Sequence, residues 1–182
     1  MINKRFFEEG GVIWITGLSG AGKSSLAIEV TLRLKKYSSN VILLDGDELR
    51  IVFATNNYQT GVDYTKNERL EKAMQYARLC RYLSEQGFIV VIATISMFNE
   101  IYRFNRLNLH NYFEVFLDVP LKELYKRDPK GIYSRYKRGK LRNIAGLDLL
   151  VDLPKNAHWS PRFSSKKSLG DLTNELISIL GR

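Results

Sequence analysis

A glycine-rich segment near the start of the chain carries the strongest chemical signal in the sequence. Residues 17–24 read GLSGAGKS and match the pattern GxxxxGK[ST], whose backbone N–H groups surround the phosphates of a nucleotide. Lys23 is placed to neutralise the β- and γ-phosphates of ATP, and the Ser24 hydroxyl is placed to bind Mg²⁺. The alternative is a glycine-rich turn with a solvated lysine. We expect an ATP site formed by Gly17, Ser19, Gly20, Ala21, Gly22, Lys23, Ser24 and Ser25.

A second charged cluster follows the next apolar run of the sequence. The segment LDGDELR contains Asp45, Asp47 and Arg50. Phosphoryl transfer to a hydroxyl needs a group that takes or orients the hydroxyl proton and cations that spread the developing charge, and this cluster supplies both. The sequence therefore favours a kinase over other nucleotide-binding proteins. The alternatives are a helix N-cap for Asp45 and a solvated acid of a first helical turn for Asp47.

The periodicity of the apolar residues predicts the elements that position these motifs. Strands are expected over 12–16, 41–44, 88–93 and 113–117, and helices over 23–34, 67–86, 121–127 and 169–180. This alternation predicts an α/β fold of the P-loop NTPase type, a doubly wound parallel sheet sandwiched by helices. Ligands of such a sheet bind at the carboxyl ends of its strands, where both motifs should meet.

The length and charge of the chain limit its organisation and its partners. We expect one kinase domain over residues 1–182, with mobile segments over 55–65 and about 129–162. The formal charge is +9, and nine of the 28 lysines and arginines lie between Lys122 and Arg142. Because glycines interrupt this run, it fits a basic lid over phosphates better than a nucleic-acid-binding helix. A nucleic-acid-binding P-loop protein and a catalytically silent ATP-binding regulator are the alternatives of another class.

Two further features bear on the location of the protein and on its core. The first nine residues lack the apolar stretch of a signal peptide, and no apolar run approaches the ~18 residues of a membrane span. We therefore expect a cytoplasmic protein without a membrane partner. Cys80 is the only cysteine, which excludes a disulfide within the chain, and its helical spacing predicts a core position.

The two charged motifs together resemble the adenylylsulfate kinases, whose corresponding segments read GLSGSGKS and LDGDNVR. The similarity continues through FEVFLDVPLKELYKRDPKGIY and spans about residues 11–148. In that family, ATP bound with Mg²⁺ donates its γ-phosphoryl group to the 3′-hydroxyl of adenosine 5′-phosphosulfate. The resemblance implies that Asp47 is the base or orients the hydroxyl, that Asp45 helps to hold Mg²⁺, and that Arg50 binds the 5′ group of the acceptor.

The family resemblance also covers the basic lid. It implies that Arg127 approaches the phosphates or the adenine of ATP, and that Lys130 lines the closing lid. A cation at a helix C-terminus is the alternative for Arg127. Dimers are common in the family, so the resemblance implies a homodimer.

One departure from the family pattern lies before the predicted helix over 67–86. The family segment GFSxxDRxENIRR supplies a phenylalanine that stacks on adenine, an arginine for the phosphosulfate and an asparagine for the nucleotide. Aligned with residues 63–72, it places Tyr64 at the phenylalanine, keeps Arg69 and puts Lys72 at the asparagine.

Two other departures fall on segments that form the acceptor site of the family. The family's ISPxR reads ISMFN at 95–99, so Ser96 is kept and Asn99 replaces the arginine. FTGID reads IAGLD at 144–148, so Ile144 replaces a second adenine-stacking aromatic, and one such stack is worth roughly 1–3 kcal/mol. The implied acceptor site consists of Asp47, Arg50, Tyr64, Arg69, Lys72, Ser96, Lys130 and Ile144.

The phosphate-binding residues are kept while the residues that read the base are changed, which indicates a different acceptor. One relative in this family phosphorylates cytidine diphosphoramidate in the pathway of capsule phosphoramidate modification. A pyrimidine stacked on Tyr64 and backed by Ile144 would suit the altered pocket. The alternative is an adenylylsulfate kinase of sulfate assimilation with a variant pocket.

Two pairs of residues each allow two interpretations. Arg103 or Arg106 could replace the arginine missing at Asn99, or could belong to a solvated basic face. His158 and Trp159 could lie near the adenine of ATP, or could serve in packing.

Overall fold

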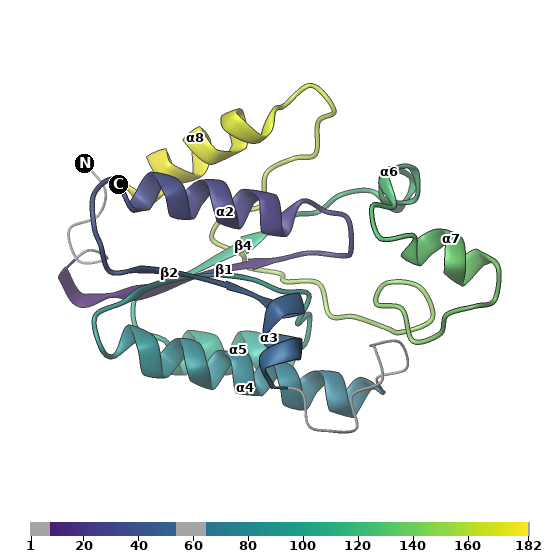
Figure 1. Cartoon of the computed structure of the whole chain (residues 1–182), viewed down its shortest axis with the longest axis horizontal. Coiled ribbons are helices and arrows are strands. Elements are labelled where there is room, and N and C mark those ends of the chain that lie inside the picture. The colour runs from purple at the N-terminus through teal and green to yellow at the C-terminus, as the bar shows by residue number, and fades with distance from the viewer. Residues whose placement is uncertain (1–7, 54–64, 182) are drawn as a thin grey trace.

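The computed structural model describes residues 8–53 and 65–181 (Figure 1). Within these ranges, one sheet contains four parallel strands in the order β2-β3-β1-β4. The strands are β1 (Gly11–Thr16), β2 (Val41–Asp45), β3 (Ile89–Ala93) and β4 (Tyr112–Phe116). All four predicted strands are present, and their ends differ from the predicted ones by one residue at most. The predicted parallel α/β sheet is confirmed.

Helices cover both faces of the sheet (Figure 1). On one face lie α2 (Lys23–Leu34) and α8 (Leu169–Leu180), and on the other α4 (Lys66–Ser84) and α5 (Asn99–Asn108). Three short helices complete the described chain: α3 (Gly46–Val52), α6 (Leu121–Arg127) and α7 (Ile132–Lys137). In the ranges that the structure describes, no helix has both the length and the apolarity needed to cross a membrane.

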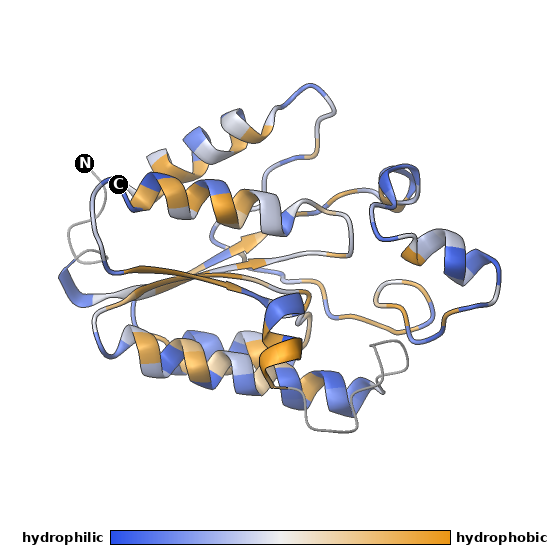
Figure 2. Cartoon of the chain, viewed as in Figure 1, coloured by the Kyte–Doolittle hydropathy of each residue, from blue (hydrophilic) through white to orange (hydrophobic). Residues whose placement is uncertain are grey.

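The central strand β1 supplies a core on each face of the sheet. Ile13 and Ile15 pack with residues of α2 and α8, whereas Val12 and Trp14 pack with residues of α4 and α5. Successive side chains of a strand point to opposite faces, and all four are fully buried. Figure 2 shows the result, with strands that are mainly apolar and helices that turn an apolar side toward the sheet. Cys80 of α4 is buried in the second core, as predicted.

Local interactions determine where the long helix α4 begins and ends. Thr65 accepts a hydrogen bond from the N–H of Glu68, whose carboxylate accepts one from the N–H of Thr65. This capping box begins the helix one residue before the predicted start. The helix ends two residues before the predicted end, and Gly87 follows in the left-handed conformation with φ of 83°.

The short helix α7 lies inside the segment predicted to be a mobile lid. It begins after Gly131, whose left-handed φ of 62° turns the chain into the helix. The carboxylate of Asp128 accepts hydrogen bonds from the N–H groups of Tyr133 and Ser134, at 3.0 and 2.9 Å. The segment thus contains ordered local structure that its glycines and charges did not predict.

The end of the lid returns to the sheet beside β4. The N–H of Trp159 donates to Glu114 O, and the N–H of Phe116 donates to Trp159 O. His158 stacks on Phe113 with ring centroids 5.2 Å apart, and its Nδ1 accepts from the N–H of Glu114. Of the two readings for His158 and Trp159, packing against β4 is therefore the correct one.

Replacing Gly10 with alanine should destabilise the fold. Gly10 has a φ of 76°, and an added Cβ would lie 2.7–2.8 Å from main-chain atoms of Ser84, Gly87 and Phe88. Left-handed strain and the forced backbone shift should together lower the free energy of unfolding by about 3 kcal/mol, measured by urea denaturation.

The matched control is Gly87→Ala, at a φ of 83° with nothing within 4 Å of the added Cβ. That variant should lose only the strain of the left-handed backbone, about 1 kcal/mol. Equal losses in the two variants would contradict the packing argument.

Candidate active site

A cavity of about 770 Å³ lies at the carboxyl ends of β1, β2 and β3. It is lined by the glycine-rich loop, α3, the start of α4, residues 93–98 and parts of segment 127–151. The sequence-predicted site residues that line it are Ser19, Gly20, Gly22, Lys23, Ser24, Ser25, Asp45, Asp47, Arg50, Arg69, Lys72, Ser96, Arg127, Lys130 and Ile144. Gly17 and Ala21 are buried, and neither lines the cavity. Tyr64 lies outside the described residues.

The glycine-rich loop has the backbone of an anion-binding turn. Gly20 and Gly22 are left-handed, with φ of 76° and 96°, and α2 begins directly after Gly22. Left-handed residues at a helix start turn successive N–H groups into one hollow, and the positive end of the helix dipole adds to it. The Nζ of Lys23 lies within this loop and donates to Leu18 O at 2.8 Å.

The ammonium group of Lys23 lies in an environment that disfavours its charge. The pKa of Lys23 is lowered from 10.5 to about 7, chiefly by burial and also by the cations of Lys130 and Arg50, while Asp45 opposes the shift. Near neutral pH the amine is therefore divided between its two forms. Phosphate oxygens in the loop would favour the ammonium form.

Asp45 joins the glycine-rich loop to the end of β2. Its Oδ1 accepts from the N–H of Asp47 at 2.8 Å, which caps α3, and its Oδ2 accepts from Ser24 Oγ at 2.5 Å. The helix-cap reading of Asp45 is therefore correct, and the same carboxylate also faces the hydroxyl predicted to bind Mg²⁺. A hydroxyl and a carboxylate are oxygen ligands of the kind that Mg²⁺ prefers.

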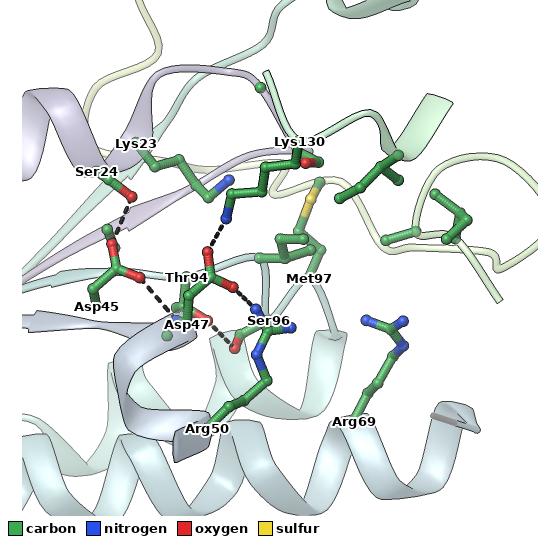
Figure 3. Close-up of a pocket in the computed structure, with 18 of the residues that line it drawn as sticks. Lys23, Ser24, Asp45, Asp47, Arg50, Arg69, Thr94, Ser96, Met97 and Lys130 are labelled. Atoms are coloured by element: carbon green, nitrogen blue, oxygen red, sulfur yellow. Dashed lines mark hydrogen bonds and ion pairs between the residues drawn. The ribbon is translucent and has the colours of Figure 1, made fainter. Parts of the chain in front are cut away.

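Asp47 lies between two cations (Figure 3). Its carboxylate forms ion pairs with Arg50, one turn along α3, and with Lys130 from the lid. Asp47 does stand in the first turn of α3, but these two pairs make it more than a solvated acid. Burial, together with the Arg50 cation, lowers the pKa of Lys130, while Asp45 opposes the shift.

The far wall of the cavity is largely aliphatic. Ile144 and Met97 line it and are both more than nine-tenths buried. The carboxylate of Asp148 accepts from the N–H groups of Asn143 and Ile144 at 2.8 and 2.6 Å, and Arg69 Nη2 donates to Asn143 O at 2.8 Å. Arg69, predicted as an anion ligand, thus also holds this wall to α4.

The start of the lid packs on the glycine-rich loop. Arg127 is the last residue of α6, its Nη1 lies 3.5 Å from Gly20 O, and its guanidinium lies over the ring of Phe163, 5.3 Å from the centroid. The hydroxyl of Tyr133 donates to Ser19 O at 2.9 Å, and burial raises the pKa of Tyr133 to about 12. Arg127 therefore lies at a helix C-terminus, as the alternative expected, and beside the glycine-rich loop; its approach to the phosphates or the adenine of ATP stays a prediction.

Arg106 has a partner that the sequence did not indicate. Its Nη2 donates to both carboxylate oxygens of Glu114, at 3.0 and 3.1 Å, and the Glu114 side chain is fully buried. Arg106 does not line the cavity, and neither does the exposed Arg103. Replacement of the missing arginine by Arg106 is thus wrong. Arg106 is exposed, as the solvated-face interpretation expected, and it also binds the buried Glu114.

Several cavity residues escaped the sequence analysis. They include Thr94, Met97, Arg135, Leu141 and Leu149. Two of them had a usable signal, because Met97 follows Ser96 and Arg135 belongs to the basic run over 122–142.

The family model described as adenylylsulphate kinase matches residues 9–160. The chain belongs to the adenylylsulphate kinase family. It is similar to the cytidine diphosphoramidate kinase of Campylobacter jejuni, with 38% identity over 144 residues, 79% of this chain and 81% of the relative. It is equally similar to the adenylyl-sulfate kinase of Pseudomonas aeruginosa, with 40% identity over 149 residues, 81% and 74% of the two chains.

A solved structure supports the same kinship. The APS kinase CysC of Mycobacterium tuberculosis, in complex with AMPPNP and APS, superposes with a TM-score of 0.81 at 31% identity, and the match covers 95% of this chain and 98% of CysC. The predicted P-loop kinase fold and the predicted enzyme class are confirmed. This member of the adenylylsulphate kinase family is thus a nucleotide kinase, and the two relatives from Campylobacter jejuni and Pseudomonas aeruginosa differ in the acceptor that their names state.

Binding of ATP·Mg²⁺ should be accompanied by proton uptake at Lys23. Its pKa is about 7 and bound phosphates favour the charged form, so the affinity for ATP should fall roughly tenfold per pH unit from about pH 7 to 9. Calorimetry in two buffers of different ionisation enthalpy should detect an uptake that approaches one proton at about pH 8.5.

Two variants assign the proton to its residue. Lys23→Arg keeps its charge throughout this range, so its binding should take up no proton. Lys130→Gln should retain the uptake at a higher pH, because Lys130 lowers the pKa of Lys23. Wild-type binding that is independent of pH would contradict the lowered pKa.

Proposed function

We propose that this chain transfers the γ-phosphate of ATP to the 3′-hydroxyl of cytidine diphosphoramidate. The observation that best supports this proposal is a cavity that combines the phosphate-binding groups of its family with an aliphatic acceptor wall. At the position of a family adenine-stacking aromatic stands the buried Ile144. A pyrimidine needs less stacking surface than a purine, and the 38% identity to the kinase from Campylobacter jejuni supports this acceptor.

The donor side of the proposed reaction uses the glycine-rich loop and Lys23. Ser24 and Asp45 would hold Mg²⁺ together with phosphate oxygens, since the described residues contain no group of three or more His, Cys, Asp or Glu side chains that could hold a metal ion. When bound, Mg²⁺ supplies positive charge that offsets the charge on the β- and γ-phosphates. Arg127 lies beside the loop and would add a further cation.

Asp47 is the proposed group that orients the 3′-hydroxyl. In the structure its carboxylate is paired with Arg50 and Lys130, and its two oxygens keep further lone pairs to which the hydroxyl can donate. The paired cations then stand beside the hydroxyl, where they can bind phosphate oxygens of the acceptor or the transferring phosphoryl group. This arrangement favours an in-line geometry.

The remaining acceptor contacts come from α4 and the loop after β3. Arg69 and Lys72 line the cavity and would bind the 5′ diphosphoramidate oxygens, while Ser96 would contact the nucleotide. Tyr64 remains a predicted base-stacking residue outside the described ranges. Lid closure would exclude water, which competes with the hydroxyl for the γ-phosphate. A single domain and a homodimer also remain predictions.

The second candidate acceptor is adenylylsulfate. It is favoured by the 40% identity to the enzyme from Pseudomonas aeruginosa and by the retained Arg50 and Arg69 at the cavity.

Parallel assays with the two acceptors test the proposal. With ATP·Mg²⁺ present, mass spectrometry should detect an added 3′-phosphate on cytidine diphosphoramidate at a kcat/KM about tenfold or more above that for adenylylsulfate, the effect of one lost stack. Ile144→Phe restores the family aromatic and should shift the ratio toward adenylylsulfate. Preference for adenylylsulfate in the wild type would replace the proposal with the second candidate, and inertness toward both would refute it.

Asp47→Asn should lower kcat by about a hundredfold or more while the affinity for ATP changes by less than about threefold, because the residue acts on the acceptor hydroxyl. Steady-state kinetics and calorimetry with AMPPNP separate the two effects. The matched control is Glu48→Gln, the same chemical change at an exposed neighbour that does not line the cavity. Unchanged turnover in Asp47→Asn would remove Asp47 from the mechanism.

A further inference from the structure

The second residue of the glycine-rich loop contacts the far wall of the cavity. We call residues 143–149 the acceptor-wall loop; three of them, Ile144, Ala145 and Leu149, line the cavity and are nine-tenths or more buried. Against this loop lies Leu18, which stands outside the lining of the cavity. Donor and acceptor ends of the cavity are therefore joined behind it by a direct side-chain contact.

The contact is made at a glycine. A Cβ added to Gly146 would lie 2.7 and 2.8 Å from Cδ1 and Cδ2 of Leu18, and its φ is 81°. No atom other than those of Leu18 is among the three nearest neighbours of that position. The isobutyl group of Leu18 thus occupies the space that a side chain at 146 would fill, so it packs directly on the backbone of Gly146.

Leu18 also contacts the group that binds the donor phosphates. Its carbonyl oxygen accepts the hydrogen bond from Lys23 Nζ at 2.8 Å. Phosphate oxygens that bind the ammonium group of Lys23 share its three protons with Leu18 O, which changes the strength and direction of this bond. The peptide of Leu18 is therefore a point at which the loop senses whether phosphates are bound.

The acceptor-wall loop is built to move as a unit. Asp148 accepts from two of its N–H groups, the N–H of Gly146 donates to Leu149 O, and the N–H of Leu149 donates to Ile144 O. Because these bonds close the loop on itself, a shift at Gly146 carries the cavity-lining side chain of Ile144 with it. Arg69 ties the start of the loop to α4 and gives the motion a fixed point.

We infer that Leu18 is a positioning residue that couples occupancy of the donor phosphate site to the position of the acceptor wall. The inference rests on the proposed donor site, but it does not depend on which acceptor the enzyme uses. Phosphates in the glycine-rich loop redirect the ammonium group of Lys23, shift Leu18 and thereby stabilise the acceptor-wall loop in one position. The acceptor then meets a stabilised wall when a phosphoryl donor is bound.

Hydrogen exchange with AMPPNP·Mg²⁺ as the only ligand tests the inference without an acceptor. In the wild-type protein, saturating AMPPNP·Mg²⁺ should slow exchange of the amides in 143–149 about fivefold, the lower end of typical coupling between sites. In Leu18→Ala, which keeps the main-chain carbonyl and the lysine, the nucleotide should still bind but the slowing should be lost. Leu18→Met, which keeps a long side chain, should retain it.

A melting-temperature rise with AMPPNP·Mg²⁺ verifies that each variant is folded and binds nucleotide. Should Leu18→Ala fail to fold, Leu18→Val serves in its place, because it also lacks the two δ-carbons. Exchange in 143–149 that does not respond to nucleotide in the wild type, or that responds equally in the shortened variants, would overturn the coupling. A wild type that shows the response while turning over neither acceptor would refute only the proposed function.

A double-mutant cycle tests the contact itself. Gly146→Ala should abolish the nucleotide response and lower the melting temperature, because its Cβ meets the δ-carbons of Leu18. Adding Leu18→Ala removes those carbons, so the double variant should recover part of the melting temperature lost by Gly146→Ala. Additive losses in the double variant would show that the two side chains do not interact and would overturn the proposed route.

Discussion

The register of β3 between β1 and β2 fixes the distance between the two charged motifs. Ala93 at the end of β3 pairs with Ile15 on one side and with Asp45 on the other. The glycine-rich loop and the carboxylates therefore leave the sheet at the same level, two strand spacings or about 10 Å apart. Ser24 closes part of that gap with its hydrogen bond to Asp45. A triphosphate with its metal ion fits between elements held at this separation, so the spacing of the strands sets the width of the site.

The charges of the site are balanced for a bound ligand rather than for the protein alone. Lys23, Lys130 and Arg50 surround two carboxylates, and mutual repulsion among the three cations contributes to the low pKa of Lys23. Such a cluster destabilises the folded chain, and anionic substrates relieve the repulsion when they bind. The ion pairs of Asp47 with Arg50 and Lys130 hold the same groups in place until then. Relief of the repulsion among these cations thus contributes to the affinity for phosphates.

The sequence predicted the elements whose causes are local and missed those whose causes are not. Apolar runs indicate the buried parallel strands, and glycines indicate the turn of the glycine-rich loop. A capping box and Gly87 mark the two ends of α4. Helix α7 depends on the carboxylate of Asp128 and on the contact of Tyr133 with Ser19, more than a hundred residues away in the chain. Likewise, nothing near Arg106 announces a buried Glu114, and the approach of Leu18 to Gly146 joins two distant segments. Residue types identified the site; only the fold assigned the partners.

The segment from Leu117 to Trp159, which contains most of the lid, is hydrogen-bonded to the sheet at both ends. Leu117, directly after β4, donates its N–H to Thr16 O, and Trp159 returns to hydrogen-bond on the other edge of β4. Roughly forty residues lie between these two anchors. The hydrogen bonds that offset the entropy cost of closing this long segment are made at the sheet and not inside the cavity. This segment behaves as a partly exchangeable cassette: Leu124 and Tyr133 belong to the core that contains α2 and α8, whereas residues around Ile144 can change without altering the strands. Ile144, which departs from the family pattern, lies in this cassette, whereas the glycine-rich loop does not. Evolution could therefore change the acceptor of the enzyme by substitutions within this one segment, while the glycine-rich loop that binds the donor phosphates stays the same.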